Sequence, residues 1–213
     1  MKLLLTLDEH NYTQDMTVYE KYSTRAVIIR NGRIATQHGA AGDYKILGGG
    51  VEPGEDLHAA LIREVQEESG LVVIPESIRE IGEIVERRRD IFEPDKIYVC
   101  HSCFFFCDAA EELAQTHMTA SEIAKGFKLE WATPEEILAG NTPFEQTQPW
   151  SYRDSRFIRM LPELMHSRAK FYIGFTQTIQ SILHDAFKIK LYDERDEKVG
   201  KVLWKRRNRW SRK

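Results

Sequence analysis

Apolar residues in the first 140 positions alternate or cluster in short segments, a pattern typical of strands arranged around one amphipathic helix. We expect strands where β-branched and aromatic residues gather, in segments 1–9, 17–30, 32–39, 44–47, 71–74, 78–86, 96–107 and 128–132. Asn31 and Gly32 form the dipeptide of a tight hairpin turn. From residue 56 to 69 the apolar positions recur every three or four residues, which predicts a helix, and Gly70 stands where a left-handed C-cap glycine is favoured.

A second helix carries its own start signal near residue 133. Thr133 is a good N-cap, Pro134 suits the first helical position, and Glu136 completes a capping box. Strands therefore lie before and after one central helix, with another helix after the last strand. This order predicts an α/β fold in which a mixed sheet is covered by helices on both faces.

The pattern changes in the last third of the chain. Residues 153–187 have helical periodicity with breaks at Pro162 and Gly174, which predicts two packed helices outside the sheet. We therefore expect a main domain over residues 1–148 and a helical C-terminal extension with a basic tail over 149–213. The extension could form a homodimer interface or a lid over a pocket, and periodicity does not choose between them.

Composition narrows the class of protein. The chain has 213 residues, 42% of them apolar, enough for one domain with a core plus an extension. Its net charge of -3 argues against a nucleic-acid-binding protein, although the segment 201–213 contains only basic charges. That tail is either a solvated terminus or a binding segment for a nucleic-acid backbone or an anionic membrane. No run of 18 apolar residues occurs, so we expect a cytoplasmic protein with no membrane partner.

Three cysteines fall within one apolar segment. Cys100, Cys103 and Cys107 are too clustered for a disulfide framework, which suits a reducing compartment. Zinc binding is the alternative, but strand alternation sends Cys100 to the face opposite the other two, and no second CxxC follows. The pattern favours buried core thiols.

Like charges crowd one side of the central helix. Glu67 and Glu68 follow Glu64 by three and four residues, so the three carboxylates emerge close together. They lie near the C-terminal end of the helix, where the helix dipole also disfavours anions. A solvated helix face is one interpretation. The other is a bound cation, and carboxylate oxygens favour Mg²⁺ or Mn²⁺. Gly48 to Gly50, just upstream, would let the backbone approach metal or phosphate.

The spacing around these glutamates fits every fixed position of a known motif. Those positions are, in order, Gly49, Glu55, Arg63, Glu64, Val65, Glu67, Glu68, Gly70 and Leu71. They match the Nudix box, so the chain resembles the Nudix hydrolase superfamily, also called MutT-like. Segments 24–35 and 129–138 are similar to that family too, whereas the C-terminal third is not covered.

The resemblance implies an α/β/α sandwich and assigns metal ligands. Glu64, Glu67 and Glu68 would hold the divalent ions, and the carbonyl of Gly48 would complete their coordination. Arg63 would orient the glutamates through charge-assisted hydrogen bonds. Arg63 and Glu67 are thus catalytic candidates as well.

Further acids could assist the site. Glu55 lies on the N-terminal side of the helix, where it can cap or pair, and the family often adds an acid at the position of Glu52. A general base comes either from the box or from a downstream loop. In that loop Glu122 is our candidate for a catalytic base, followed by Glu130 and Glu112, each with a plain surface role as the alternative.

Substrate contacts are expected at the glycine turn and in a basic segment. Gly49 and Gly50 would bind substrate through their backbone. Arg87 and Arg88, with Arg89 beside them, could receive phosphates, because nearby segments often face substrate in this family.

The implied activity is a metal-dependent pyrophosphohydrolase, in which water attacks phosphorus in a nucleoside diphosphate linked to another moiety. The partner is a nucleotide-diphosphate small molecule, and no downstream signature identifies which one. Two alternatives are a Nudix-fold regulator that binds a nucleotide without hydrolysis and a Nudix-fold isoprenoid diphosphate isomerase. The intact box argues against the first, and the lack of a catalytic cysteine motif argues against the second.

Overall fold

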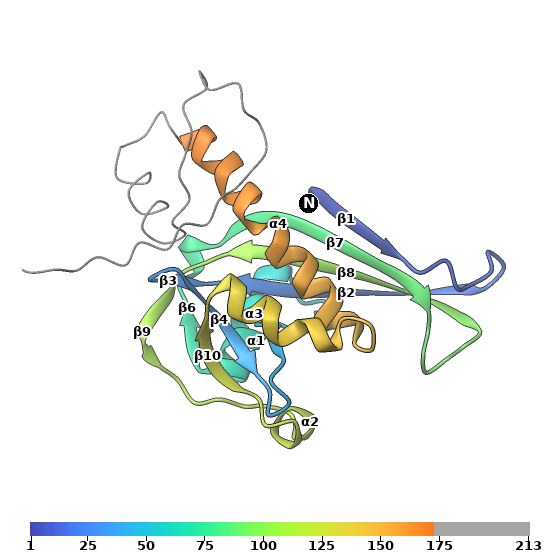
Figure 1. The fold of residues 1–213 in the computed structure, drawn as a ribbon, viewed down its shortest axis with the longest axis horizontal. Helices are drawn as coiled ribbons and strands as arrows, with labels where there is room; N and C mark the ends of the chain where they lie inside the picture. The colour runs from blue at the N-terminus through green and yellow to red at the C-terminus, as the bar shows by residue number, and fades with distance from the viewer. Residues whose placement is uncertain (173–213) are drawn as a thin grey trace, which may run out of the picture. The chain divides into compact units, whose positions relative to one another are not determined.

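The computed structural model describes residues 1–172 of the chain (Figure 1). One compact unit spans Met1–Leu161, and a second begins at Pro162, of which the described part is helical as far as Tyr172. The first unit contains all the strands of the described residues. The predicted division into domains at residue 148 stays a prediction.

Five strands precede the first helix, and groups of strands and helices follow it. The strands are β1 (Leu3–Asp8), β2 (Thr17–Val27), β3 (Ile29–Arg30), β4 (Arg33–His38), β5 (Tyr44–Ile46), β6 (Leu71–Val73), β7 (Arg79–Arg89), β8 (Lys96–Phe106), β9 (Ala109–Leu113) and β10 (Lys128–Ala132). The helices are α1 (Leu57–Ser69), α2 (Ala120–Ala124), α3 (Pro134–Asn141) and α4 (Pro149–Tyr172), with short 3-10 turns η1 (Pro75–Ser77) and η2 (Thr142–Phe144). None of these helices is long and apolar enough to cross a membrane.

The strands form two four-stranded sheets and one two-stranded sheet rather than a single sheet. One has the order β1-β7-β8-β2, in which β1 and β2 run parallel to their neighbours and β7 runs antiparallel to β8. The other has β10, β4 and β3 in order, with β5 also paired to β4, all antiparallel. β6 and β9 form the pair. The α/β class with mixed sheet pairing is confirmed.

Helices pack on both faces of the first sheet. Neighbouring residues of β8 point to opposite faces, so this strand provides apolar side chains for both contacts. Phe105 belongs to the core cluster that includes Leu61 and Val65 of α1. Phe104, on the other face, stacks on Phe157 of α4 with ring centroids 3.9 Å apart. The same alternation buries all three cysteines of the chain, and all are free thiols.

The predicted ends of α1 and α3 are confirmed. Asp56 caps α1 by accepting hydrogen bonds from two backbone N–H groups of its first turn, and Gly70 adopts the left-handed conformation at its end, with φ of 74°. Thr133 and Glu136 form the capping box of α3. Polar caps stabilise helix ends because they satisfy N–H groups that have no partner inside the helix.

The structure corrects three predictions about secondary structure. β9 and α2 were not expected, because 109–113 and 120–124 are only five residues long and show no clear strand or helix pattern. The helix α4 continues through Pro162, so the predicted break there is wrong. One proline removes a single helical hydrogen bond, and the rest of this 24-residue helix is retained. The second predicted break, at Gly174, lies outside the described residues.

Candidate active site

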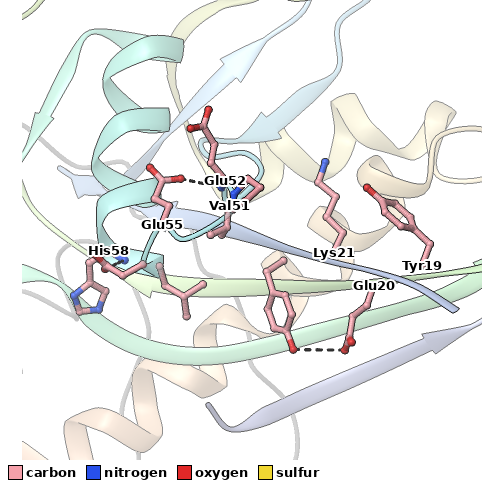
Figure 2. Close-up of a pocket in the computed structure, with 11 residues that line it drawn as sticks. Tyr19, Glu20, Lys21, Val51, Glu52, Glu55 and His58 are labelled. Carbon is pink, nitrogen blue, oxygen red and sulfur yellow. Dashed lines mark hydrogen bonds between the residues drawn. The ribbon is translucent and has the colours of Figure 1, made fainter.

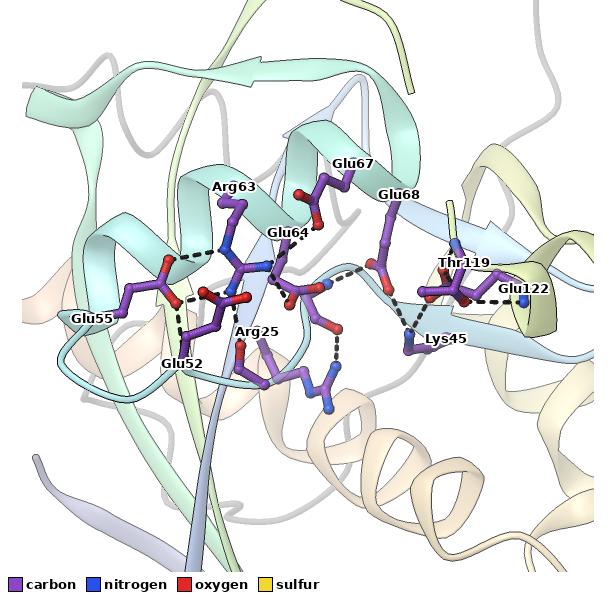
Figure 3. Close-up of polar contacts among 12 residues, drawn as sticks. Arg25, Lys45, Glu52, Glu55, Arg63, Glu64, Glu67, Glu68, Thr119 and Glu122 are labelled. Atoms are coloured by element: carbon purple, nitrogen blue, oxygen red, sulfur yellow. Dashed lines mark hydrogen bonds and ion pairs between the residues drawn. The ribbon is translucent and has the colours of Figure 1, made fainter. Parts of the chain in front are cut away.

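Helix α1 presents its three clustered glutamates to different surroundings. Glu68 follows Leu61 by seven residues and Val65 by three, so it continues the buried stripe of the helix and is only 2% exposed. Glu64 is partly buried, with its side chain 16% exposed, and Glu67 is the most open at 38%. The three carboxylates therefore range from buried to open, and Figure 3 shows the three side chains extending from α1 next to Arg63 and Lys45.

Glu68 is neutralised from the adjacent strand β5. Its Oε1 lies 2.5 Å from Nζ of Lys45, and its Oε2 accepts a hydrogen bond of 2.7 Å from the backbone N–H of Gly48. Burial raises the pKa of Glu68 to about 7, although the charge and hydrogen bond of Lys45 act in the opposite direction. The carboxyl group is thus close to its titration midpoint at neutral pH.

Arg63 connects the helix to the loop before it. Its guanidinium donates two hydrogen bonds to Glu55, of 2.9 and 2.8 Å, and one of 3.0 Å to the carbonyl oxygen of Gly50. Nη1 also donates to Glu64 at 2.8 Å and to Glu67 at 3.3 Å. The hydrogen bond from Arg63 lowers the pKa of Glu55 to about 2. One cation therefore orients two of the clustered glutamates, as the sequence predicted for this residue, although its catalytic role is untested.

The glycine turn lies directly against these carboxylates. At Gly49 a Cβ atom would overlap the carboxylate of Glu64, whose three terminal atoms would all lie within 2.6 Å of it. At Gly48 the backbone has a φ of 129°, and a Cβ would meet the main chain of Thr24. The carbonyl oxygen of Gly48 accepts a hydrogen bond from Nη1 of Arg25. Gly49 is therefore needed for the close approach of the turn to α1, and Gly48 for its close approach to β2.

A buried charge network supports the turn from the side of α4. Arg153 donates to Asp154 at 2.9 Å and to Glu86 at 3.2 Å, and Asp154 accepts a 2.9 Å hydrogen bond from the backbone N–H of Ile46, in β5. Arg25 is also buried, and burial followed by the nearby charge of Arg153 lowers its pKa. The start of α4 therefore holds β5 in place, and β5 carries Lys45, which pairs with the buried Glu68.

Comparison with known proteins identifies the motif that these contacts organise. A family model described as the NUDIX domain matches residues 21–153, which is more than half of the chain. The chain belongs to the Nudix hydrolase family. The resemblance seen in the sequence is thus confirmed, as is the prediction that the protein is an enzyme of this hydrolase family with a mixed α/β Nudix fold.

Several solved Nudix structures are similar to the chain. The ORF135 protein of E. coli is 25% identical over 57% of this chain and 79% of its own, with a TM-score of 0.37. A NUDIX hydrolase from Nitrosomonas europaea is 19% identical over 58% and 79%, with a TM-score of 0.44. The MutT protein of Methanosarcina mazei is 18% identical over 60% and 85%, with a TM-score of 0.40. The search of curated proteins found no match.

The Nudix box supplies donors of the right kind for a divalent cation. Glu64, Glu67 and Glu68 offer carboxylate oxygens, the ligands that Mg²⁺ and Mn²⁺ prefer, and the missing side chain of Gly49 lets the Glu64 carboxylate lie directly against the turn. As the side chains stand, no three His, Cys, Asp or Glu residues of the described part form a metal-binding group. The carboxylates are instead paired with Arg63 and Lys45. The donor set fits a divalent ion, and its role as a metal site stays a prediction.

Among the predicted downstream acids, Glu122 joins the box. Its Oε1 lies 3.5 Å from Nζ of Lys45, the lysine that pairs with Glu68. Its Oε2 accepts hydrogen bonds of 2.8 Å from both the backbone N–H and the hydroxyl of Thr119, which form the capping box of α2. Burial tends to raise its pKa, but these hydrogen bonds and the charge of Lys45 outweigh it and lower the pKa of Glu122.

The other two acids lie apart from the box. Glu130 pairs with Nδ1 of His38 at 2.6 Å and accepts from the hydroxyl of Tyr44 at 3.5 Å, whose ring stacks on that of His38. Glu112 is exposed on β9. Neither has a hydrogen bond or ion pair with a box residue in the described part of the chain.

The two arginines predicted to bind substrate project from opposite faces of β7. The guanidinium of Arg87 lies over the ring of Tyr12, 4.9 Å from its centroid, and that of Arg88 over the ring of Tyr98, 4.5 Å away. Alternation along a strand separates neighbouring residues in this way. Their predicted phosphate contacts stay untested.

Two cations of the site were not predicted from the sequence. Lys45 lies in β5 between two buried apolar residues, and Arg25 lies in the buried half of β2. A lysine or arginine in the middle of a buried strand needs a charged partner, and this is the signal that could have identified both residues.

Proposed function

We propose that the protein is a Mg²⁺- or Mn²⁺-dependent pyrophosphohydrolase that cleaves a nucleoside diphosphate linked to another moiety. The observation that carries this proposal is the contact between Gly49 and the carboxylate of Glu64, beside the buried Glu68. A helix gains no stability from such clustered carboxylates. A metal-bound diphosphate would need carboxylates to hold the metal next to a turn whose backbone it can approach, and the box carboxylates lie against such a glycine turn.

In this proposal the box carboxylates of Glu64, Glu67 and Glu68, with the carbonyl of Gly48, hold the divalent ion. The ion would neutralise the phosphoryl oxygens and lower the pKa of a bound water. Arg63 keeps Glu64 and Glu67 in position through its hydrogen bonds. Lys45 balances the charge of Glu68 within the protein itself.

Glu122 is the proposed general base, acting through Oε1. Oε2 accepts hydrogen bonds of 2.8 Å from both groups of Thr119, whereas Oε1 has only the longer contact of 3.5 Å with Nζ of Lys45, so Oε1 is the oxygen that can accept a proton from the attacking water. The lowered pKa of Glu122 keeps its carboxylate charged at neutral pH, as a base must be. Gly49 and Gly50 would bind the phosphates through their backbone, and Arg88 or Arg87 would contact more distant parts of the substrate.

The test is product release from a panel of nucleoside diphosphates carrying different second groups, with and without Mg²⁺ or Mn²⁺. We expect hydrolysis of at least one member that requires the cation and is nearly abolished in Glu68→Gln. Glu76→Gln, at an exposed glutamate of η1, is the matched control and should retain full turnover. Hydrolysis that persists in Glu68→Gln or without divalent ions would refute the proposal.

The same panel separates the main alternative, a regulator that binds nucleotide without hydrolysis. Such a protein would bind members of the panel in calorimetry, and no product would form at any cation concentration. The intact carboxylate group of the box favours hydrolysis.

A further inference from the structure

A hollow of about 870 Å³ opens beside the site, between the edge of β2 and the loop that enters α1 (Figure 2). This is within the range of about 300–1,000 Å³ that small-molecule sites occupy. Its lining residues are Tyr19, Glu20, Lys21, Tyr22, Val51, Glu52, Pro53, Glu55, Asp56, Leu57 and His58. The Nudix box thus continues into a space large enough for a nucleoside.

The edge of β2 is exposed where it borders this hollow. The glycine turn pairs with the inner part of the strand, through hydrogen bonds from Thr24 N–H to Gly49 O (2.9 Å) and from Val51 N–H to Tyr22 O (3.0 Å). The strand is exposed from Thr17 to Tyr22. An extended ligand leaving the turn would therefore pass directly along these exposed residues.

Lys21 and Tyr19 follow the turn in that order on one face of the strand. Nζ of Lys21 would lie 3.4 Å from a Cβ built on Gly50, so the lysine borders the turn. Tyr19 is two residues further on, about 7 Å along the strand, and points to the same side, as Figure 2 shows. Its side chain is 47% exposed. Its ring lies 6.1 Å from that of Tyr98, which in turn lies under the guanidinium of Arg88.

Acidic side chains dominate the lining of the hollow. The hollow is lined by four carboxylates and one lysine, and that lysine lies at the end next to the turn. A second phosphate deep in the hollow would be repelled, whereas an uncharged base and ribose would not be. An exposed tyrosine ring offers a stacking surface for any base.

We propose that this hollow binds the nucleoside of the substrate, with the base stacked on Tyr19 and the adjacent phosphate held by Lys21. The proposal rests on the proposed function for the position of the scissile diphosphate. It restricts the substrates to diphosphates that carry an aromatic base, and it excludes those built on a lipid or a sugar alone.

Binding of reaction products tests the proposal without requiring hydrolysis. The probes are AMP, GMP, CMP and UMP, with ribose 5-phosphate as the probe that lacks a base, measured by calorimetry with Mg²⁺ present. We expect Tyr19→Ala to weaken the best-bound nucleotide by about tenfold, which is typical for loss of a stacked aromatic ring, and Tyr19→Phe to restore binding. Ribose 5-phosphate should be insensitive to Tyr19→Ala, whereas Lys21→Gln should weaken both kinds of probe.

Tyr12→Ala is the matched control, because that tyrosine is part of an aromatic contact, under Arg87 of β7, but does not line the hollow. Unchanged nucleotide binding in Tyr19→Ala, equal binding of ribose 5-phosphate and nucleotides, or no binding of any nucleotide would overturn the proposal. Thermal unfolding of each variant verifies that it is folded.

The outcomes separate this proposal from the proposed function. If Tyr19→Ala loses nucleotide binding while no diphosphate is ever hydrolysed, the nucleoside site stands and the hydrolase fails. If a diphosphate is hydrolysed with divalent ions at the same KM in Tyr19→Ala as in the unmodified protein, the hydrolase stands and the nucleoside site fails.

Discussion

Replacing Gly49 by alanine should remove activity and leave the fold intact. The backbone of Gly49 is not in the left-handed region, so alanine can adopt its conformation. The added methyl group would, however, occupy the space of the Glu64 carboxylate. That carboxylate is the end of a flexible side chain, so we expect Glu64 to swing away rather than the turn to move.

In Gly49→Ala the expected loss of stability is small, whereas the expected loss of activity is large. The ion pair between Glu64 and Arg63, which this movement would break, is partly exposed, at 16% and 27%, and such pairs contribute about 0–1 kcal/mol to folding. The melting temperature should therefore fall by no more than about 2–4 °C. Loss of one charge-stabilising group from an active site typically lowers kcat by about 100-fold or more, and we expect that range here.

Substitutions at two other glycines of the same loop, Gly48 and Gly54, provide the comparison for Gly49→Ala. Gly48→Ala should destabilise the fold by about 3 kcal/mol, because its φ of 129° disfavours alanine and the methyl would meet the main chain of Thr24. Gly54→Ala has open space around it and should cost about 1 kcal/mol with unchanged activity.

The assay pairs differential scanning calorimetry with steady-state kinetics on the best substrate of the panel. If Gly49→Ala keeps kcat within about threefold of the unmodified protein, the position of Glu64 is not critical and the reasoning fails. A loss of activity that only parallels a large loss of stability would refute it equally.

Three other predictions concern buried groups. Burial raises the pKa of Glu68 from its ordinary 4.5 to about 7. In metal-free protein its contribution to the free energy of unfolding is therefore full below pH 4.5, and about 3 kcal/mol is lost as the pH rises through 7. Glu68→Gln should flatten this part of the pH profile, measured by urea titrations. Asp154→Ala should destabilise the fold by about 3–5 kcal/mol in urea unfolding, because it removes one of the two carboxylates that pair with the buried Arg153 and leaves the backbone N–H of Ile46 without its acceptor. A loss below about 1 kcal/mol would contradict that. No cysteine should react with a thiol reagent at about pH 8 until the protein unfolds. All three, Cys100, Cys103 and Cys107, are buried, and burial raises the pKa of Cys103 and Cys107 to about 12. Labelling of the native protein would disprove this.

Local rules predicted the helix that carries the site. Asp56 and Gly70 mark the ends of α1 through chemistry within a few residues, and the box spacing places Arg63 where it reaches Glu55 and Glu64. The caps and the contact between Arg63 and Glu64 follow from local geometry, so the sequence contains them, whereas the contact with Glu55 depends also on the loop before the helix.

The remaining features depend on tertiary packing. The sequence does not indicate that Lys45 reaches Glu68, since these residues come from different elements whose relative position is set by core packing and by Asp154 beneath β5. β9 was missed for the same reason, because its residues are alanine, glutamate and leucine, with no β-branched or aromatic residue, and it takes strand conformation through its pairing with β6. Helix α4 overrides the local preference of Pro162.

The reach of one guanidinium sets the length of the loop before α1. Arg63 holds the carbonyl of Gly50 at one end of that loop and the carboxylate of Glu55 near the other. Surface loops usually tolerate inserted residues at little cost. This one should not, because an added residue would detach one of its two anchors, and the five-residue interval of the motif is the length that a single arginine can span.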